Sequence, residues 1–500
     1  MPSALLHQRG DTRATDSKTV KALSFDVPQG VEALTLRFDY QPRTTSDEAK
    51  NKALLQAAFE IHTERRKSLL SSDELAKHRE ALGVERRAKC LDNLMNVVLV
   101  DPNGQWRGRW DRNPSSNDGA LVLAEAHASR GFLPGEIQPG TWTAAIECHG
   151  VFGEPVSWEI AVEAREPLTD DEIDRLRSRA VATKDRKRRG AGWYFGEMHS
   201  HTVHSDGKWE IEELASKVRA NGSDFLCLTD HNTMSGHEEP PELPLTLIRG
   251  SELTTFHGHH PIYGLKDMVP WHEGGRVLPL KEVAPRVRAQ NGLVSIAHPF
   301  VPGDPLCTGC RMPKDLDPED FDSMELGDRR WLSPGADNVA AYNLWNDYWR
   351  RGHRIVGVGA RDVHGPDQEG SFPGEMPLTG VFAEDNTPSA ILEGLRRGRV
   401  IVSGGPIVEL ALSVGGGAPA RIGESIRGDV DAAEVTISNL DAPAELRLLD
   451  KGEVIERTDV AADGTETFAL TGRGPGWYRA ELWAGDVPRT ITNHVIWEEA

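Results

Sequence analysis

Residues 193–207 read Trp-Tyr-Phe-Gly-Glu-Met-His-Ser-His-Thr-Val-His-Ser-Asp-Gly, so two histidines, His199 and His201, follow a short apolar run. The apolar run predicts a strand over Trp193–Glu197. In an extended chain the side chains of residues i and i+2 point the same way, about 7 Å apart, which allows two imidazoles to hold one metal ion. The stretch therefore predicts a strand that ends in a metal-binding His-X-His pair.

Outward from this strand, short apolar runs alternate with amphipathic stretches of helix length as far as residue 405. The candidate strands are Trp193–Glu197, Phe225–Thr229, Thr246–Gly250, Pro261–Leu265, Leu293–Ala297, Ser323–Leu326, Arg354–Gly359 and Gly380–Ala383. The candidate helices are 209–221, 279–291, 337–351 and 387–397. Alternation of strand and helix predicts a parallel sheet, and about seven such units would form a compact (β/α)7-type barrel over 193–405.

The segments on either side of this barrel are predicted to be β-structure. Residues 17–165 contain runs in which apolar and polar residues alternate, typical of half-buried strands, and predict a β-sandwich with a helical insertion at 45–90. Residues 166–192 are highly charged and predict a solvated linker rather than an anion-binding patch. Residues 406–500 return to the alternating pattern and predict a second, small β-sandwich. The expected fold class is thus multidomain α/β plus β, three domains in 500 residues.

Charge and hydropathy limit the partners. With 57 Lys and Arg against 77 Asp and Glu the net charge is −20, which repels the phosphates of duplex nucleic acid and of anionic membranes. The sequence contains no apolar run long enough for a membrane span and no secretory signal, so we expect a cytoplasmic protein. A small-molecule substrate is the expected partner, and self-association through the sandwiches is left open.

The five cysteines are too few for a disulfide scaffold. Cys307-Thr-Gly-Cys310 is a lone Cys-X-X-Cys, and a structural zinc site would need a second pair. We predict a loop with free thiols in a reducing compartment, with a labile disulfide as the alternative.

Metal-ligating residue types follow several other candidate strands, and twelve of the 18 histidines fall between residues 199 and 364. The strand-end residues are His231, Glu252, His298, Asp362 and His364. Active sites of (β/α) barrels lie at the carboxyl ends of the strands, so these residues can converge although they are far apart in the sequence. Nitrogen and oxygen donors without thiolate suit Zn²⁺, Mn²⁺ or Fe²⁺. Because the donors are too many for one ion, a centre of two or three divalent metals is predicted.

The motifs resemble those of the polymerase-and-histidinol-phosphatase (PHP) superfamily of metallohydrolases. The resemblance rests, in order, on the His-Ser-His-Thr-Val-His-Ser-Asp-Gly of 199–207, Thr-Asp-His-Asn of 229–232, Ser-Glu of 251–252, Ala-His-Pro of 297–299 and Asp-Val-His of 362–364. It covers roughly 193–405 and implies a distorted PHP barrel. The flanking regions resemble, more loosely, the CehA/McbA branch, named for carbaryl hydrolases.

The resemblance also implies a ligand set. The first metal would be held by His199, His201, Glu252 and Asp362; the second by Glu252, His298 and His259; the third by Asp206, His231 and His364. His259 is preferred within Phe256–Pro261, while His257 and His260 stay open.

These metals would activate a bridging hydroxide that attacks phosphorus or a carbonyl carbon. His204 or His257 would protonate the leaving group, and Arg361 is either structural or reaches a substrate anion. The favoured function is a phosphoesterase acting on a small phosphorylated molecule. A carbamate, ester or amide hydrolase is the first alternative, and a non-catalytic scaffold or sugar-binding protein is the second. Arg249, Arg329, Arg330 and Arg361 are the candidate phosphate clamps, and Trp271, Trp331, Trp345 and Trp349 are the candidates for an apolar pocket.

Overall fold

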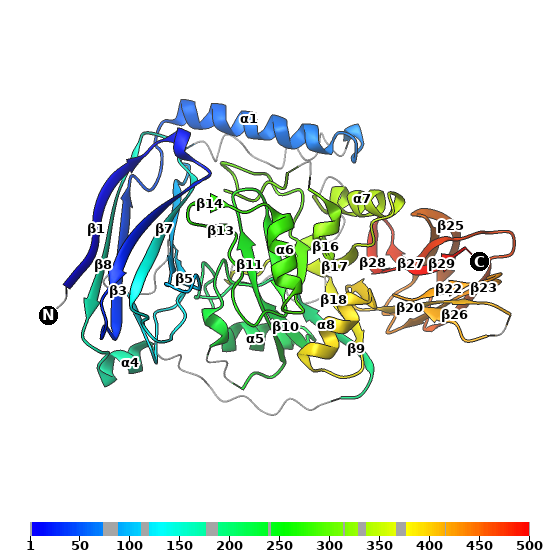
Figure 1. The fold of residues 1–500 in the computed structure, drawn as a ribbon. Helices are drawn as coiled ribbons and strands as arrows, with labels where there is room; N and C mark the ends of the chain where they lie inside the picture. The colour runs from blue at the N-terminus through cyan, green and yellow to red at the C-terminus, as the bar shows by residue number, and fades with distance from the viewer. Residues whose placement is uncertain are drawn as a thin grey trace.

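The computed structural model describes residues 3–73, 89–111, 120–176, 189–238, 242–313, 316–328, 337–366, 377–415 and 417–499. The chain is mixed α/β, with many strands and few helices. Figure 1 shows N-terminal strands at the left, the strands and helices that carry the histidine motifs in the centre, and C-terminal strands at the right. Among the described residues no helix is long and apolar enough to cross a membrane.

The N-terminal part contains two four-stranded antiparallel sheets. One has the order β1 (Ser3–Thr12), β8 (Val156–Arg165), β3 (Ala33–Gln41), β6 (Ala120–Ala124), and the other β2 (Thr19–Val27), β7 (Gly140–Gly150), β4 (Leu94–Val100), β5 (Trp106–Trp110). The alternating apolar residues of both sheets share one core, in which Phe38 meets Trp110 edge to face. Since β1 belongs to the first sheet, the β-structure begins before residue 17.

Helix α1 (Glu48–Arg66) occupies the first half of the expected helical insertion, and residues 74–88 lie outside the described ones. The side chain of Asp47 accepts a hydrogen bond from the Lys50 amide and so caps the helix. Figure 1 shows α1 reaching from the N-terminal sheets over the central part of the chain. Helix α4 (Asp170–Leu176) begins the charged segment, of which residues 177–188 lie outside the description.

The central sheet departs from the fully parallel prediction. Its order is β17 (Val356–Ala360), β16 (Ser323–Asp328), β15 (Leu293–Ile296), β12 (His259–Tyr263), β11 (Thr246–Thr254), β10 (Phe225–Leu228), β9 (Gly192–Glu197), β18 (Leu378–Ala383), β19 (Val400–Ser403). Strands β9, β10 and β11 are parallel, as are β15, β16 and β17, but β12 runs antiparallel to β11 and β15, and β18 to β9 and β19. Four residues connect β11 to β12, too few for the crossover that a parallel pair requires.

The expected helices of the central part are present. They are α5 (Ile211–Ala220), α6 (Leu280–Arg288), α7 (Asp337–Arg350) and α8 (Pro388–Arg396). A small hairpin of β13 (His272–Glu273) and β14 (Arg276–Val277) directly precedes α6 in the chain. Leu214 and Val218 on α5 are fully buried and pack against Leu226 and Leu228 of β10, which explains the amphipathic pattern of 209–221.

The C-terminal strands continue the central sheet. Strand β19 pairs with β28 (Val487–Thr492), and the sheet continues through β27 (Gly476–Ala484) and β24 (Ala444–Asp450) to β25 (Glu453–Val460). A second sheet has the order β21 (Ala420–Arg421), β20 (Ile407–Ser413), β23 (Ala432–Ser438), β26 (Gly464–Ala469), and β22 (Ser425–Arg427) pairs with β29 (Val495–Glu498). The expected boundary at 405–406 therefore lies within one continuous network of strands.

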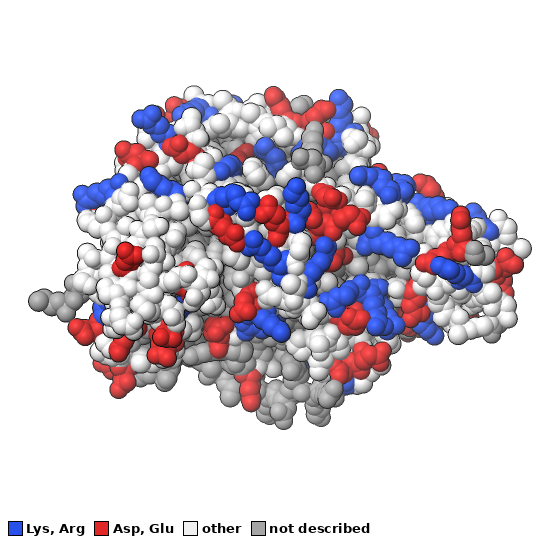
Figure 2. Space-filling model, in the orientation of Figure 1, with Lys and Arg blue, Asp and Glu red and all other residues white. Residues whose placement is uncertain are grey.

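Acidic and basic side chains are interspersed over the face seen in Figure 2, most densely over the central and C-terminal parts. The net charge of −20 is therefore not gathered into one acidic patch on this face.

Candidate metal centre

Main-chain hydrogen bonds bring the motif-bearing strand ends side by side. The amide of His201 donates to the carbonyl oxygen of Val363 (2.8 Å), and the amide of Val363 donates to that of His199 (3.1 Å). On the other flank, His231 and Glu252 form a parallel bridge, in which the amide of Asn232 donates to the carbonyl oxygen of Glu252 (3.0 Å). These bonds place four of the sequence motifs around one point.

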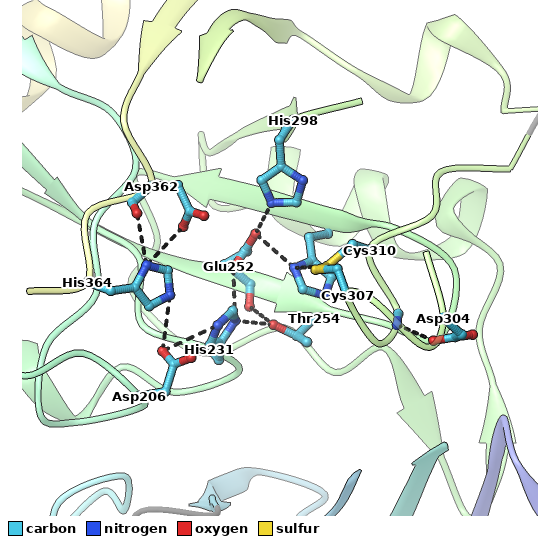
Figure 3. The surroundings of a disulfide bond; sticks show 12 residues. Asp206, His231, Glu252, Thr254, His298, Asp304, Cys307, Cys310, Asp362 and His364 are labelled. Atoms are coloured by element: carbon cyan, nitrogen blue, oxygen red, sulfur yellow. Dashed lines mark hydrogen bonds and ion pairs between the residues drawn. A yellow bond between two sulfur atoms is a disulfide. The ribbon is translucent and has the colours of Figure 1, made fainter. Parts of the chain in front are cut away.

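Nine predicted ligands meet there, with the carboxylate of Glu252 at the centre. Figure 3 shows His231, His298 and the carboxylates of Glu252, Asp206 and Asp362 directed toward one another from different strands and loops. The nitrogen–oxygen distances are 3.2 Å for His199–Glu252, 3.1 Å for His201–Asp362, 3.3 Å for His259–Glu252, 3.5 Å for His298–Glu252, 3.5 Å for His231–Asp206 and 3.4 Å for His364–Asp206. We call these nine residues the Glu252 cluster.

The donor atoms of the Glu252 cluster form four overlapping groups, each with all atoms within 4.8 Å of one another. The groups are His199–His201–Asp362, His199–Glu252–His298, His231–Glu252–His259 and His201–Asp206–His231–His364. They overlap with the predicted ligand sets but are not identical to them, because His201 also faces Asp206 and His231 also faces Glu252. Within the loop left open by the sequence, His259 enters the cluster, His257 is exposed, and the buried His260 ring lies 5.3 Å from that of Phe321.

The bonding of the cluster tests whether it suits metal ions. Atoms that face into the cluster without a hydrogen-bond partner among the described residues include Nε2 of His199, both ring nitrogens of His201, both carboxylate oxygens of Glu252 and Oδ1 of Asp206. Buried polar atoms are normally hydrogen bonded, so this many in one place is unusual. Lone pairs that converge on one point suit cations between them, and nitrogen and oxygen donors fit Zn²⁺, Mn²⁺ or Fe²⁺.

Neighbouring groups fix the orientation of three histidine rings. Nδ1 of His199 contacts Glu325 (2.8 Å), Nδ1 of His231 contacts the Thr254 hydroxyl (2.5 Å), and Nδ1 of His364 contacts the main-chain oxygen of Asp362 (2.8 Å). Each ring then has Nε2 facing a carboxylate of the cluster. Holding the second ring nitrogen in this way is how proteins orient metal-binding imidazoles.

Glu325 is a functional candidate that the sequence interpretation missed. It lies on β16, and its other carboxylate oxygen accepts a hydrogen bond from the His298 amide (2.7 Å). A carboxylate within the apolar run 323–326 was the available signal. Glu325 therefore supports His298, whose φ of 24° is unusual for a residue other than glycine, as is the φ of 51° at Asp362. Such conformations cost about 1–3 kcal/mol each and concentrate at functional sites.

Burial and charge shift the pKa values within the cluster in opposite directions. Burial lowers the pKa values of the imidazoles, and neighbouring carboxylates raise them. At His199 and His231 the effect of the carboxylates is the larger one, so their pKa values rise well above the usual range. In the same way the pKa of His298 rises to about 8 and that of His364 to about 9. Burial and the neighbouring His364 and His231 lower the pKa of His201 to about 3. Without cations, the cluster therefore balances its carboxylate charge with protonated histidines.

The residues proposed for acid catalysis lie outside the cluster. His204 contacts the Ser235 hydroxyl (2.9 Å) and lines a pocket with Arg130 and Phe132 of the N-terminal part. Burial and the nearby Arg130 lower the pKa of His204 to about 3, so its ring is neutral at pH 7. His257 is exposed on the loop before β12.

The described arginines and tryptophans that were predicted to contact a substrate bond to or pack against other parts of the protein. The Arg361 guanidinium forms a buried ion pair with Glu197 (2.9 Å). Of the two roles predicted for Arg361, this contact corresponds to the structural one. The Arg249 guanidinium donates to main-chain oxygens of His237, Leu265 and Lys266. Trp271 and Trp345 are fully buried in the core, and Trp349 packs on His494. Arg329, Arg330 and Trp331 lie outside the described residues.

The expectation of free thiols at Cys307 and Cys310 is wrong for this structure, which joins the two residues in a disulfide. A turn in which the Cys310 amide donates to the Cys307 carbonyl oxygen (3.2 Å) brings the Cα atoms to 5.4 Å, within the range that a disulfide spans.

No protein-family model and no curated protein matches the sequence. Among solved structures, a two-domain protein of Bacteroides vulgatus containing a predicted PHP-like metal-dependent phosphoesterase is 17% identical, with a TM-score of 0.35 over 64% of this chain and 99% of that one. An amidohydrolase of Chromobacterium violaceum is 14% identical, with a TM-score of 0.26 over 35% of this chain and 89% of that one.

Proposed function

We propose that the protein is a metal-dependent hydrolase of the PHP superfamily that acts as a phosphoesterase on a small phosphorylated substrate. The observation that supports this proposal is the Glu252 cluster, in which nine nitrogen and oxygen donors converge and many have no hydrogen-bond partner among the described residues. His199, His201, Asp362 and Glu252 would hold one cation, and Glu252, with both oxygens in the cluster, would share a second with His259 and His298.

Divalent cations bound there would lower the pKa of a coordinated water and polarise the substrate oxygen that gains charge. The protein's own residues prepare the site for this chemistry. Glu325 holds His199 and His298 in position, and the Thr254 hydroxyl holds His231. Such outer contacts keep the ligands in one geometry and exclude alternative rotamers.

Exposure within the cluster indicates where a substrate would enter. The side chains of Glu252 and His199 are 1% and 0% exposed, whereas those of His364 and Asp206 are 26% and 40% exposed. The group of Asp206, His231 and His364 therefore lies at the open side, where a third cation would meet the substrate. Three cations suit the three free oxygens of a phosphoryl group, which is why we favour a phosphoester over a carbamate.

The experiment combines metal analysis with two substrates. Protein reconstituted with Mn²⁺ or Zn²⁺ is expected to bind two or three ions per chain and to hydrolyse an aryl phosphate. His199→Ala should lose metal and lower kcat/KM by at least about a thousandfold, equivalent to about 4 kcal/mol. His353→Ala is the matched control, because His353 lies outside the cluster, paired with Glu319 (2.6 Å), and its loss should leave metal content and turnover unchanged.

The other outcomes identify the alternatives. Hydrolysis of an aryl N-methylcarbamate alone, lost in His199→Ala, would make the protein a carbamate hydrolase. Less than one ion per chain with no turnover would overturn the metallohydrolase and favour the scaffold or sugar-binding function.

A further inference from the structure

The disulfide lies against the Glu252 cluster. Cys310 Sγ is 4.0 Å from Nδ1 of His259, and the same nitrogen is 3.3 Å from Oε1 of Glu252 (Figure 3). Cys310 is 2% exposed, so its sulfur is enclosed beside the cluster rather than in solvent. The proposed reaction gives this sulfur no role.

The loop that carries the disulfide is anchored on both sides. Toward the cluster, the Gly258 amide donates to the carbonyl oxygen of Gly309 (2.7 Å). Gly258 directly precedes His259, and Gly309 directly precedes Cys310. Away from it, Asp304 pairs with Lys18 of the N-terminal part (2.7 Å) and also accepts a hydrogen bond from the Gly309 amide (2.9 Å). These contacts do not depend on the sulfur–sulfur bond, so Cys310 should stay beside His259 when that bond is broken.

We propose that the Cys307–Cys310 disulfide is a reversible modification of the metal centre, and that its reduction adds the Cys310 thiolate as a ligand to the cation held by His259. The inference rests on the metal centre of the proposed function. Sulfur and nitrogen ligands of one tetrahedral Zn²⁺, at about 2.3 and 2.0 Å from the ion, lie about 3.5 Å apart. The observed 4.0 Å between Cys310 Sγ and His259 Nδ1 requires only a small movement.

The exposure of the two cysteines predicts which sulfur a reductant attacks. Cys307 is partly exposed and Cys310 is buried, so a dithiol reductant would attack Cys307. The attack breaks the sulfur–sulfur bond, forms a mixed disulfide at Cys307 and releases Cys310 as a thiolate. The second thiol of the reductant then attacks the mixed disulfide, which leaves Cys307 as a thiol and the reductant as its own disulfide. Two electrons pass to the protein, and the reductant's two protons go to Cys307 and to solvent.

The inference is tested with Co²⁺, because thiolate ligation gives a near-ultraviolet sulfur-to-cobalt charge-transfer band that nitrogen and oxygen ligands do not give. All proteins carry Cys90→Ser, which removes the exposed free cysteine. Protein in the disulfide form should bind Co²⁺ without the band. After treatment with immobilised dithiothreitol, removal of the reductant and anaerobic addition of Co²⁺, the band should appear, and the Kd for Cd²⁺ should fall at least about tenfold.

Two matched variants separate the sulfurs, since each removes one sulfur and the disulfide with it. Cys307→Ser should show the band without any reductant, and Cys310→Ser should not show it under any condition. Co²⁺ bound without the band in both the reduced protein and Cys307→Ser would overturn this inference alone. The band in Cys310→Ser, or a disulfide that alkylation and mass analysis show to resist the dithiol in the folded protein, would do the same. No Co²⁺ in either redox state would overturn the metal centre and this inference with it.

Discussion

Two buried clusters of histidines and carboxylates in the described part of the chain differ in how their carboxylate oxygens are hydrogen bonded. One is the Glu252 cluster; the other, the Glu147 cluster, consists of Arg109, Glu147, His149 and His272. Both glutamates are fully buried. In the Glu147 cluster one carboxylate oxygen is hydrogen bonded to His272 (3.0 Å), and the other to His149 (3.2 Å) and Arg109 (3.3 Å).

The difference shows that residue type alone does not identify a metal site. In the Glu147 cluster a guanidinium already occupies the place of a cation, and both carboxylate oxygens are bonded. In the Glu252 cluster the carboxylate oxygens face only histidine nitrogens among the described residues, such as His231 Nδ1 at 2.8 Å and His199 Nε2 at 3.2 Å, and neither oxygen has a hydrogen-bond partner there. Since Glu147 lies on β7 and His272 on β13, the Glu147 cluster joins the N-terminal and central parts. We therefore assign it a structural role.

Of the changes that should affect the two clusters differently, we expect the largest effect from a substitution in the Glu147 cluster, on the free energy of unfolding. Glu147→Gln removes the buried negative charge that faces Arg109, and breaking a buried ion pair costs about 3–5 kcal/mol. We expect the free energy of unfolding, measured in urea, to fall by about 3 kcal/mol while the metal content of the folded protein is unchanged. Glu159→Gln is the control, because its pairs with Arg9 and His7 are exposed to solvent and should contribute little to stability. Loss of metal with unchanged stability in Glu147→Gln would contradict the structural role.

The convergence of seven of the nine donors could be predicted from the sequence because each of these follows a short apolar run, whereas Asp206 and His259 were assigned from the family resemblance. Parallel strands bring their carboxyl ends to one edge, so residues as far apart as His199 and His364 meet. The choice of His259 over His260 rested on the family pattern. Its physical basis is that successive strand residues point to opposite faces, and β12 begins at His259.

Other features could not be predicted, because no local pattern encodes them. Arg109, Glu147 and His272 come from distant segments, so their contact depends on how the N-terminal sheets pack on the central part. Similarly, Arg361 was a candidate substrate contact until the fold placed it beside Glu197. The antiparallel position of β12 follows from the short connection after Thr254, but only once the strand ends are known.

Removal of metal should have the next largest effect, and only through the Glu252 cluster. Ions present at a hundred times their Kd stabilise the folded protein by about 2.7 kcal/mol, so a chelator should lower the free energy of unfolding by about that amount. Glu252→Gln should show no response to the chelator. Glu147→Gln, although less stable, should respond like wild type. An equal response in Glu252→Gln would mean that the ions bind outside the cluster.

The smallest effect concerns pH, where the clusters should respond on opposite sides of neutrality. In the ion-free protein, carboxylates raise the pKa of His298 to about 8 and that of His364 to about 9 against the opposing effect of burial. Both rings are protonated at pH 7, and a cation must displace these protons to bind. The affinity for Zn²⁺ or Mn²⁺, measured by competition with a chromophoric chelator, should therefore rise from pH 7 to 9, about tenfold per pH unit for each proton released.

The Glu147 cluster should instead lose stability in acid. Burial lowers the pKa of His149 to about 4, so this ring is neutral when folded and would be protonated below about pH 6.5 when unfolded. Its contribution to stability is complete above about pH 6.5 and is lost as the pH falls toward 4. Urea unfolding of the chelated protein should show this loss in wild type, and less of it in His149→Gln. If metal affinity stays constant from pH 7 to 9 while acid stability follows His149, the histidines of the Glu252 cluster do not carry the protons that their surrounding carboxylates favour.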